Sequence, residues 1–149
     1  MSDNILKLIP ADPYFIPDEK AQQAALDLLT AWLPMADVLN GTASDEVNFV
    51  DPDMNLQQIF CPACGSPLDM EVWQGFTDAA YATQFADLSV TMPCCVALGS
   101  LNDLHYDWPA GFARYVLESL NPNADLDDAQ LDELAHILGC ALSKIWAVY

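Results

Sequence analysis

The chain has 149 residues, of which 53% are hydrophobic, so it is long and apolar enough to bury a core of its own. Its 22 Asp and Glu residues are set against only four Lys and Arg residues, which gives a formal net charge of −18. A surface of this sign repels phosphate backbones and anionic lipid, so direct binding to nucleic acid or to a membrane surface is excluded. We expect one folded domain over residues 1–149.

The basic residues are unevenly distributed. Residues 21–113 contain no Lys or Arg, although this span holds twelve acidic residues and every candidate metal ligand. The acidic residues are interleaved with large apolar ones, which is typical of a folded protein rather than of a disordered acidic tail. Segment 1–17 lacks the apolar stretch of a secretory signal, and no segment reaches the roughly 18 to 20 apolar residues of a membrane span. We therefore expect a cytoplasmic protein.

The N-terminal part of the chain reads as strand, helix and strand. The branched apolar run 4–9 is closed by a proline, as a short strand is. Ala, Leu and Trp recur at helical spacing over 19–33, with Asp18 at the N-cap position. The Asn-Gly pair at 40–41 is a turn signal, and the alternating segment 46–50 after it predicts a second strand.

The C-terminal part repeats this order. Segment 112–120 predicts a strand, although its residues also suit a helix. Asp127 and Gln130 form a start like a capping box for a helix that ends at Gly139. The β-branched and aromatic segment 143–149 predicts a final strand.

These elements predict the fold class. Strand, helix and strand in each half is the split βαβ pattern of a ferredoxin-like α+β sandwich, with two helices on one face of a four-stranded antiparallel sheet. The cysteine-bearing segment 59–100 then falls at the central hairpin as an inserted subdomain. Within it, 71–85 reads as a helix and 87–92 as a strand.

The stretch Cys61-Pro-Ala-Cys64-Gly has the C-P-x-C-G form of a zinc knuckle. Two thiolates at this spacing can converge on one ion, and the glycine permits the tight backbone reversal. A tetrahedral site needs two more ligands, and Cys94 and Cys95 are the obvious suppliers. The remaining cysteine, Cys140, reads as a small core residue.

On these residues, segment 59–100 resembles zinc-ribbon proteins, and the resemblance implies bound Zn²⁺. It departs from the ribbon pattern at Met92, which stands where the second knuckle would have its first cysteine. Because adjacent cysteines bind one ion in a tighter geometry, Cys95 with His105 as the fourth ligand is a competing set. Two reduced cysteine pairs in a small core are the alternative without metal. Four thiolates would close the site to water, so we expect structural rather than catalytic zinc.

Loop 100–112 gathers aromatic and polar side chains of the kind that make recognition surfaces. The candidate partner-binding residues are Asn102, Asp103, Tyr106, Asp107 and Trp108. In the alternative reading, Asn and Asp cap turns, while Tyr106 and Trp108 pack the insertion against the sheet.

The sequence contains no recognisable catalytic or cofactor-binding motif, and it has only two histidines for acid–base chemistry near neutral pH. These features favour a non-catalytic, zinc-stabilised acidic module that binds a basic protein, as an inhibitor, an immunity protein or a nucleic-acid mimic would. One alternative is a zinc-ribbon accessory protein of transcription or nucleic-acid machinery that acts through protein contacts. Another is a zinc enzyme with an atypical site.

Overall fold

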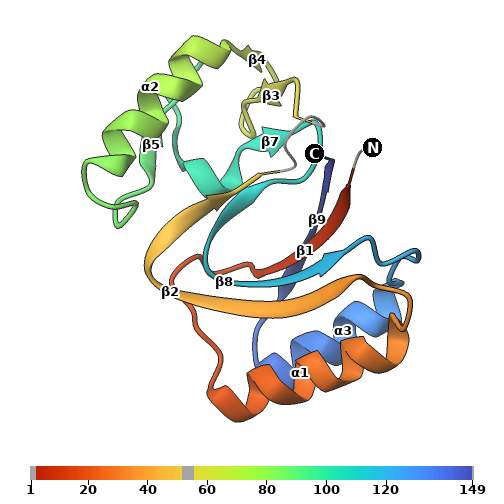
Figure 1. Ribbon diagram of the computed structural model, residues 1–149. Helices are drawn as coiled ribbons and strands as arrows, with labels where there is room; N and C mark the ends of the chain where they lie inside the picture. Colours follow the sequence, from red (N-terminus) through yellow and green to blue (C-terminus); the bar gives the residue numbers. More distant parts are fainter. Residues whose placement is uncertain (1–2, 52–55, 149) are drawn as a thin grey trace.

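The computed structural model describes residues 3–51 and 56–148 (Figure 1). The framework elements are, in chain order, β1 (Asn4–Pro10), α1 (Glu19–Trp32), β2 (Val38–Val50), β8 (Gly111–Leu120), α3 (Asp128–Leu138) and β9 (Leu142–Val148). Between β2 and β8 the chain forms β3 (Ile59–Phe60), β4 (Pro67–Leu68), α2 (Met70–Tyr81), β5 (Ser89–Thr91), β6 (Leu98–Ser100), a 3₁₀ turn (Leu101–Asp103) and β7 (His105–Tyr106). The protein therefore has a mixed α and β fold, as the sequence predicts.

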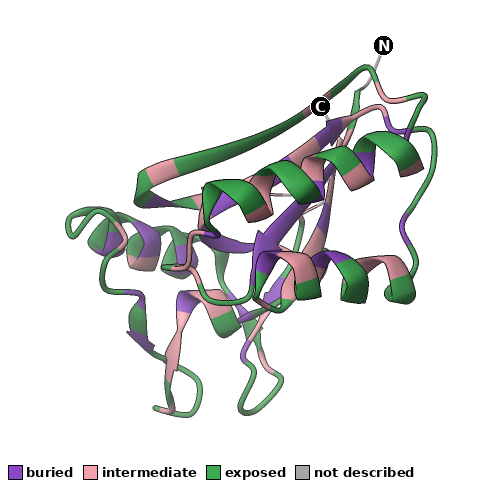
Figure 2. Cartoon of the chain, turned by 90° about the horizontal axis from the view of Figure 1, so that it is seen from below, coloured by how far each residue is buried: buried purple, intermediate pink, exposed green. Residues whose placement is uncertain are grey.

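The four framework strands form one sheet in the order β2-β8-β1-β9, and every neighbouring pair is antiparallel. The helices α1 and α3 lie side by side on one face of this sheet (Figure 1). Side chains at alternate strand positions point to this face, so Leu6, Leu8, Tyr115 and Leu117 pack with Leu29 of α1 in a buried cluster. The outward faces of the two helices are mostly exposed (Figure 2).

The predicted ends of the framework helices are confirmed. Asp18 caps α1 by accepting a hydrogen bond from the Ala21 amide at 2.7 Å. Asp127 and Gln130 form a reciprocal capping box at the start of α3, and Gly139 ends this helix with a φ of 80°.

In the described part of the chain, none of the helices combines the length and the apolar character needed to cross a bilayer.

The predicted turn at Asn40 and Gly41 is wrong, because both residues lie inside β2 and pair with β8. A Cβ atom on Gly41 would lie 2.9 Å from the hydroxyl oxygen of Tyr115. The close approach of a side chain from the neighbouring strand, rather than a turn, therefore explains this glycine. As a result, β2 begins at Val38, well before the predicted strand 46–50.

The helix predicted over 71–85 is confirmed only in part. It ends at Tyr81, and Gln84 and Phe85 both adopt a φ of 58°, which a right-handed helix cannot continue. Strand β5 likewise covers only the middle of the predicted strand 87–92. Through the turn at Gln84 and Phe85 the chain leaves α2 and enters β5, the first strand of the second cysteine hairpin.

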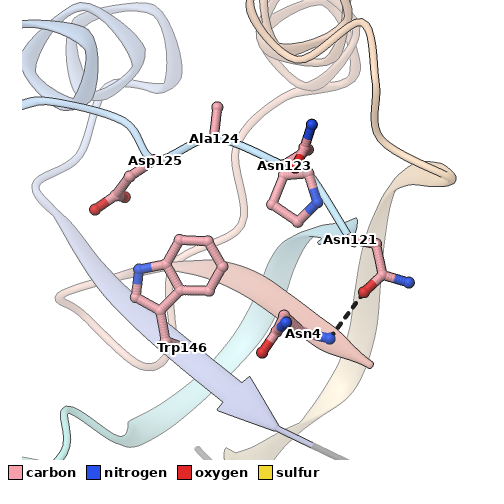
Figure 3. A pocket seen from close by; sticks show the side chains of 7 residues that line it. Asn4, Asn121, Asn123, Ala124, Asp125 and Trp146 are labelled. Carbon is pink, nitrogen blue, oxygen red and sulfur yellow. Dashed lines mark hydrogen bonds between the residues drawn. The ribbon is translucent and has the colours of Figure 1, made fainter. Parts of the chain in front are cut away.

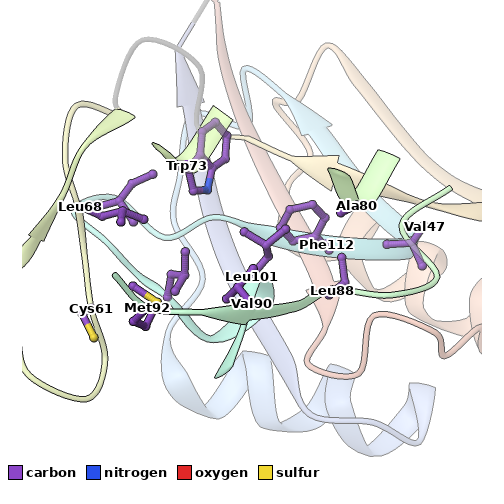
Figure 4. Close-up of a cluster of buried hydrophobic side chains, with 12 residues drawn as sticks. Val47, Cys61, Leu68, Trp73, Ala80, Leu88, Val90, Met92, Leu101 and Phe112 are labelled. Carbon is purple, nitrogen blue, oxygen red and sulfur yellow. The ribbon is translucent and has the colours of Figure 1, made fainter. Parts of the chain in front are cut away.

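A second group of buried side chains fills the segment between β2 and β8. It joins Trp73 of α2, Met92 and Leu101 to Val47 of β2 and Phe112 of β8 (Figure 4). Because the last two residues belong to the larger sheet, this cluster attaches the cysteine-bearing segment to the framework.

Candidate metal centre

Cys61 and Cys64 lie on the turn that joins the antiparallel strands β3 and β4. The Cys61 amide donates to the Ser66 carbonyl, and the Gly65 amide donates to the Cys61 carbonyl, both at 2.9 Å. Gly65 has a φ of 75°, which favours glycine and gives the tight reversal that the motif predicts. The first knuckle is therefore the loop of a short hairpin.

Cys94 and Cys95 lie on an equivalent turn between β5 and β6. Here the Met92 amide donates to the Ala97 carbonyl at 2.9 Å, and the Val96 amide donates to the Met92 carbonyl at 2.8 Å. These are the same two hydrogen bonds that close the first knuckle. Met92 thus occupies the place of the first knuckle cysteine, and Cys94 occupies the place of the variable residue.

Val96 takes the place of the knuckle glycine. Its φ is 59°, a conformation that β-branched side chains rarely adopt. The side chain is 74% exposed, so little packing offsets this backbone strain. The second knuckle therefore has the same backbone conformation as the first, although Val96 favours this conformation far less than glycine does.

The four cysteine sulfurs converge in space, and all of them lie within 4.8 Å of one another. The distance is 3.8 Å from Cys61 to Cys95, 3.9 Å from Cys94 to Cys95 and 3.2 Å from Cys64 to Cys94. Zn–S bonds of about 2.3 Å place the sulfurs of a tetrahedral site roughly 3.8 Å apart. Two of these distances match such a site and one is shorter, so the four residues fit a soft metal ion in tetrahedral geometry.

The cluster is buried on one side only. Cys61 is fully buried in the cluster that contains Trp73 and Phe112, whereas Cys64, Cys94 and Cys95 are exposed. An ion bound there would be anchored to the core through one ligand and would face solvent through the others. It would join two hairpins that are otherwise separated by α2 in the chain.

Hydrogen bonds give the cysteine thiols of this cluster different pKa values. The hydroxyl and amide of Ser66 lower the pKa of Cys64 to about 6, and the Cys64 amide is the main cause that lowers the pKa of Cys61. The hydrogen bond from Cys94 to the Cys64 thiolate raises the pKa of Cys94 to about 12. Without a metal, Cys64 and Cys94 therefore hold one proton between them at neutral pH, and a bound cation would displace it.

His105, the alternative fourth ligand, does not belong to this group. It is exposed on β7, opposite Phe60 of β3. Among the residues that the structure describes, the cluster of potential ligand atoms consists of the four cysteines alone. Cys140 is half-buried and packs against the core beneath α1 and α3, as expected for a small core residue.

Much of the predicted partner loop is held by internal hydrogen bonds. The Asn102 side chain donates to the Ala11 carbonyl at 3.1 Å and accepts from the Phe112 amide at 2.8 Å. The Tyr106 hydroxyl donates to the Leu101 carbonyl at 2.7 Å. These contacts match the alternative reading, in which the loop joins the insertion to the sheet.

The remaining candidates of this loop, Asp103, Asp107 and Trp108, are exposed. One carboxylate oxygen of Asp107 accepts from the amides of Gln57 and Trp108, so this residue also stabilises the local backbone. Trp108 is 44% exposed and does not pack as deeply as Tyr106. A recognition role for these three residues stays a prediction.

A pocket that the sequence did not indicate lies beside the connector from β8 to α3 (Figure 3). Its volume is about 300 Å³, and Trp146 of β9 lies beside Asn123 and Asp125 in its lining. The Asn4 amide donates to the Asn121 side chain at 2.9 Å. In the sequence, residues 121–123 predict only the end of a strand, because the neighbours that complete this pocket come from both ends of the chain.

No protein-family model, curated protein or solved structure matches this chain. What the structure itself defines is a mixed α and β protein with a candidate metal centre of four cysteines on two matched hairpin turns. The function therefore has to be inferred from the chemistry of this site and of the surface around it.

Proposed function

We propose that Cys61, Cys64, Cys94 and Cys95 hold a structural Zn²⁺ ion. The observation that supports this is the convergence of four sulfurs from two turns with the same hydrogen-bond pattern. Four thiolates complete a tetrahedral coordination shell, so no position is left for a reactive water or a substrate. When bound, the ion supplies cross-linking rather than chemistry.

We also propose that segment 59–100 is a zinc-ribbon-like insertion in a ferredoxin-like framework. The matched knuckles support the first part of this proposal. The antiparallel strand order β2-β8-β1-β9, with one helix after β1 and one after β8, supports the second. The insertion then occupies the hairpin connection between the two framework strands β2 and β8.

We propose that the protein is a non-catalytic acidic module that docks a basic protein partner. Its unneutralised negative charge is the observation that carries this function, because four basic residues cannot balance 22 acidic ones. Three of the four are moreover bound inside the chain: Lys7, Arg114 and Lys144 each donate to a backbone carbonyl. An inhibitor, an immunity-type protein or a nucleic-acid mimic uses a surface of this kind to attract a cationic partner.

The test is affinity purification of the zinc-loaded chain from its native host, followed by kinetics with the recovered protein. We expect a basic protein whose association rate falls at least about tenfold between roughly 50 and 500 mM salt, because electrostatic steering is screened over this range. An association rate that does not change with ionic strength contradicts the proposal. So does tight binding of the chain to single- or double-stranded nucleic acid at physiological salt.

A further inference from the structure

A pocket lined by aromatic rings lies between α2 and the C-terminal part of β2. Phe49 comes from β2, Trp73, Asp78 and Tyr81 come from α2, and Phe85 comes from the turn after α2. The pocket has a volume of about 300 Å³. Its lining contains none of the four cysteines, and Tyr106 of the loop 100–112 contacts two of its rings, Phe49 and Trp73.

Three of the four rings of this pocket, those of Phe49, Trp73 and Phe85, pack in the core cluster, whereas Tyr81 is 69% exposed. Phe49 packs edge to face against Trp73 at a centroid distance of 5.3 Å, and Phe85 packs in the same way against Tyr81 at 5.7 Å. Both phenylalanines also contact Phe112 of β8, which lies in the core cluster with Trp73 (Figure 4). The inner wall of the pocket is therefore preformed.

The polar lining of the pocket carries negative charge. Gln74 donates to one carboxylate oxygen of Asp78 at 3.0 Å, and the other oxygen has no hydrogen-bond partner among the described residues. Asp78 is exposed, and no Lys or Arg lines this pocket. Arg114 lines a different pocket, beside Asp45 and Glu46, and donates its Nε–H to a backbone carbonyl there.

We propose that this pocket binds the side chain of an arginine that a basic protein partner presents. Aromatic faces attract cations, and a planar guanidinium can stack on them while donating paired hydrogen bonds to a carboxylate. An apolar side chain would cover Asp78 without satisfying its free oxygen, and an acidic one would be repelled. The inference rests on the proposed function, since it names the place where the basic partner docks.

The test uses the zinc-loaded full chain at low salt and three peptides of equal length. One alternates Arg and Gly, the second alternates Lys and Gly, and the third has norleucine in place of the basic residues. Binding is followed by NMR at the indole N–H of Trp73, which is fixed by its hydrogen bond to Tyr106. We expect the Arg peptide to bind about three- to tenfold more tightly than the Lys peptide and to shift this resonance.

Matched variants separate the pocket from the general charge. Asp78→Asn and Tyr81→Ala should each weaken binding of the Arg peptide by about three- to tenfold. Glu71→Gln removes an equal charge from an exposed position at the other end of α2, and it should change the affinity by less than twofold.

The outcomes distinguish the two proposals. If the Arg and Lys peptides bind equally and Asp78→Asn behaves like Glu71→Gln, the arginine pocket is wrong while acidic docking stands. If neither basic peptide binds at low salt, the proposed function itself is contradicted. If the norleucine peptide shifts Trp73 most strongly, the pocket takes an apolar side chain and the arginine assignment fails.

Discussion

The sulfur of Cys64 lies 3.2 Å from the sulfur of Cys94, although the two residues belong to different hairpins. This distance is shorter than the roughly 3.8 Å edge of a tetrahedral zinc–thiolate site. In the absence of metal the pair shares one proton, because the pKa of Cys64 is lowered to about 6 and that of Cys94 is raised to about 12. A metal ion would replace this proton and separate the two sulfurs by a few tenths of an ångström.

The first prediction concerns the metal and folding. Purified protein should contain one zinc per chain, and Cys61→Ala should lower the free energy of unfolding by at least about 3 kcal/mol, because it removes the buried ligand. Elemental analysis and thermal melting measure this. Cys140→Ala is the control, since it should leave the zinc content unchanged. Unchanged melting after complete zinc removal would show that the metal has no structural role.

The ligand set can be tested separately. We expect X-ray absorption to show four sulfur ligands in the wild type, as the cluster predicts. Cys94→Ala should reduce the number of sulfur ligands, whereas His105→Ala should leave the spectrum unchanged, because His105 lies outside the cluster. A nitrogen ligand that disappears in His105→Ala would favour the competing set of Cys61, Cys64, Cys95 and His105.

Val96→Gly should stabilise the protein. Relief of the left-handed backbone conformation contributes about 1–2 kcal/mol, and the added flexibility of glycine in the unfolded chain costs about 0.5–1 kcal/mol. A net gain of about 0.5–1 kcal/mol is expected in urea unfolding of the zinc-loaded protein. Gly65→Val is the reciprocal control and should destabilise the first knuckle. A loss of stability in Val96→Gly would contradict the inference that the backbone at Val96 is strained.

Two glycines should respond in opposite ways to alanine. Gly41→Ala should destabilise the protein by about 1–3 kcal/mol, because its Cβ would meet the Tyr115 hydroxyl at 2.9 Å. Gly75→Ala should stabilise α2 by about 1 kcal/mol, since open space surrounds that position and alanine is the better helix former. Denaturant unfolding measures both. If Gly41→Ala also stabilised the protein, the Tyr115 side chain or the strands β2 and β8 would have moved apart to accept the added methyl group.

The thiols of the metal-free protein should differ in reactivity with pH. Because the pKa of Cys64 is lowered from 9.0 to about 6, its thiolate should be alkylated readily at pH 7, and the rate should fall as the pH drops through about 6. Cys94, with its pKa raised to about 12, should react slowly at pH 7. Mass spectrometry of the alkylated peptides measures these rates below the melting temperature.

The same lowered pKa of Cys64 links the metal-free fold to pH. A lowered pKa adds stability that is fully present above the unfolded value near 9 and is lost as the pH falls through about 6. Ser66→Ala should raise the pKa of Cys64, so alkylation at pH 7 should slow, while Cys140 serves as an internal reference. If the alkylation rate of Cys64 relative to Cys140 is the same in Ser66→Ala as in the wild type, the role of Ser66 is contradicted.

Features that depend on a few neighbouring residues could be predicted from the sequence alone. The caps at Asp18 and Asp127 and the end of α3 at Gly139 need only contacts within one helical turn. The first knuckle is equally local, because Cys61 to Gly65 contain both the ligands and the reversal. The strands and helices of the framework were visible through their periodicity, which reports burial on one face.

Features that depend on distant segments were decided only by the tertiary structure. Gly41 has the local signature of a turn, yet it pairs with Leu117 of β8, and the Tyr115 side chain occupies the space that a Cβ atom would need. The pairing of Cys64 with Cys94 and the aromatic pocket around Asp78 each combine separate elements that no short pattern connects. Long-range packing sets these contacts, because side chains far apart in sequence meet only when the core that joins β2, α2 and β8 has formed.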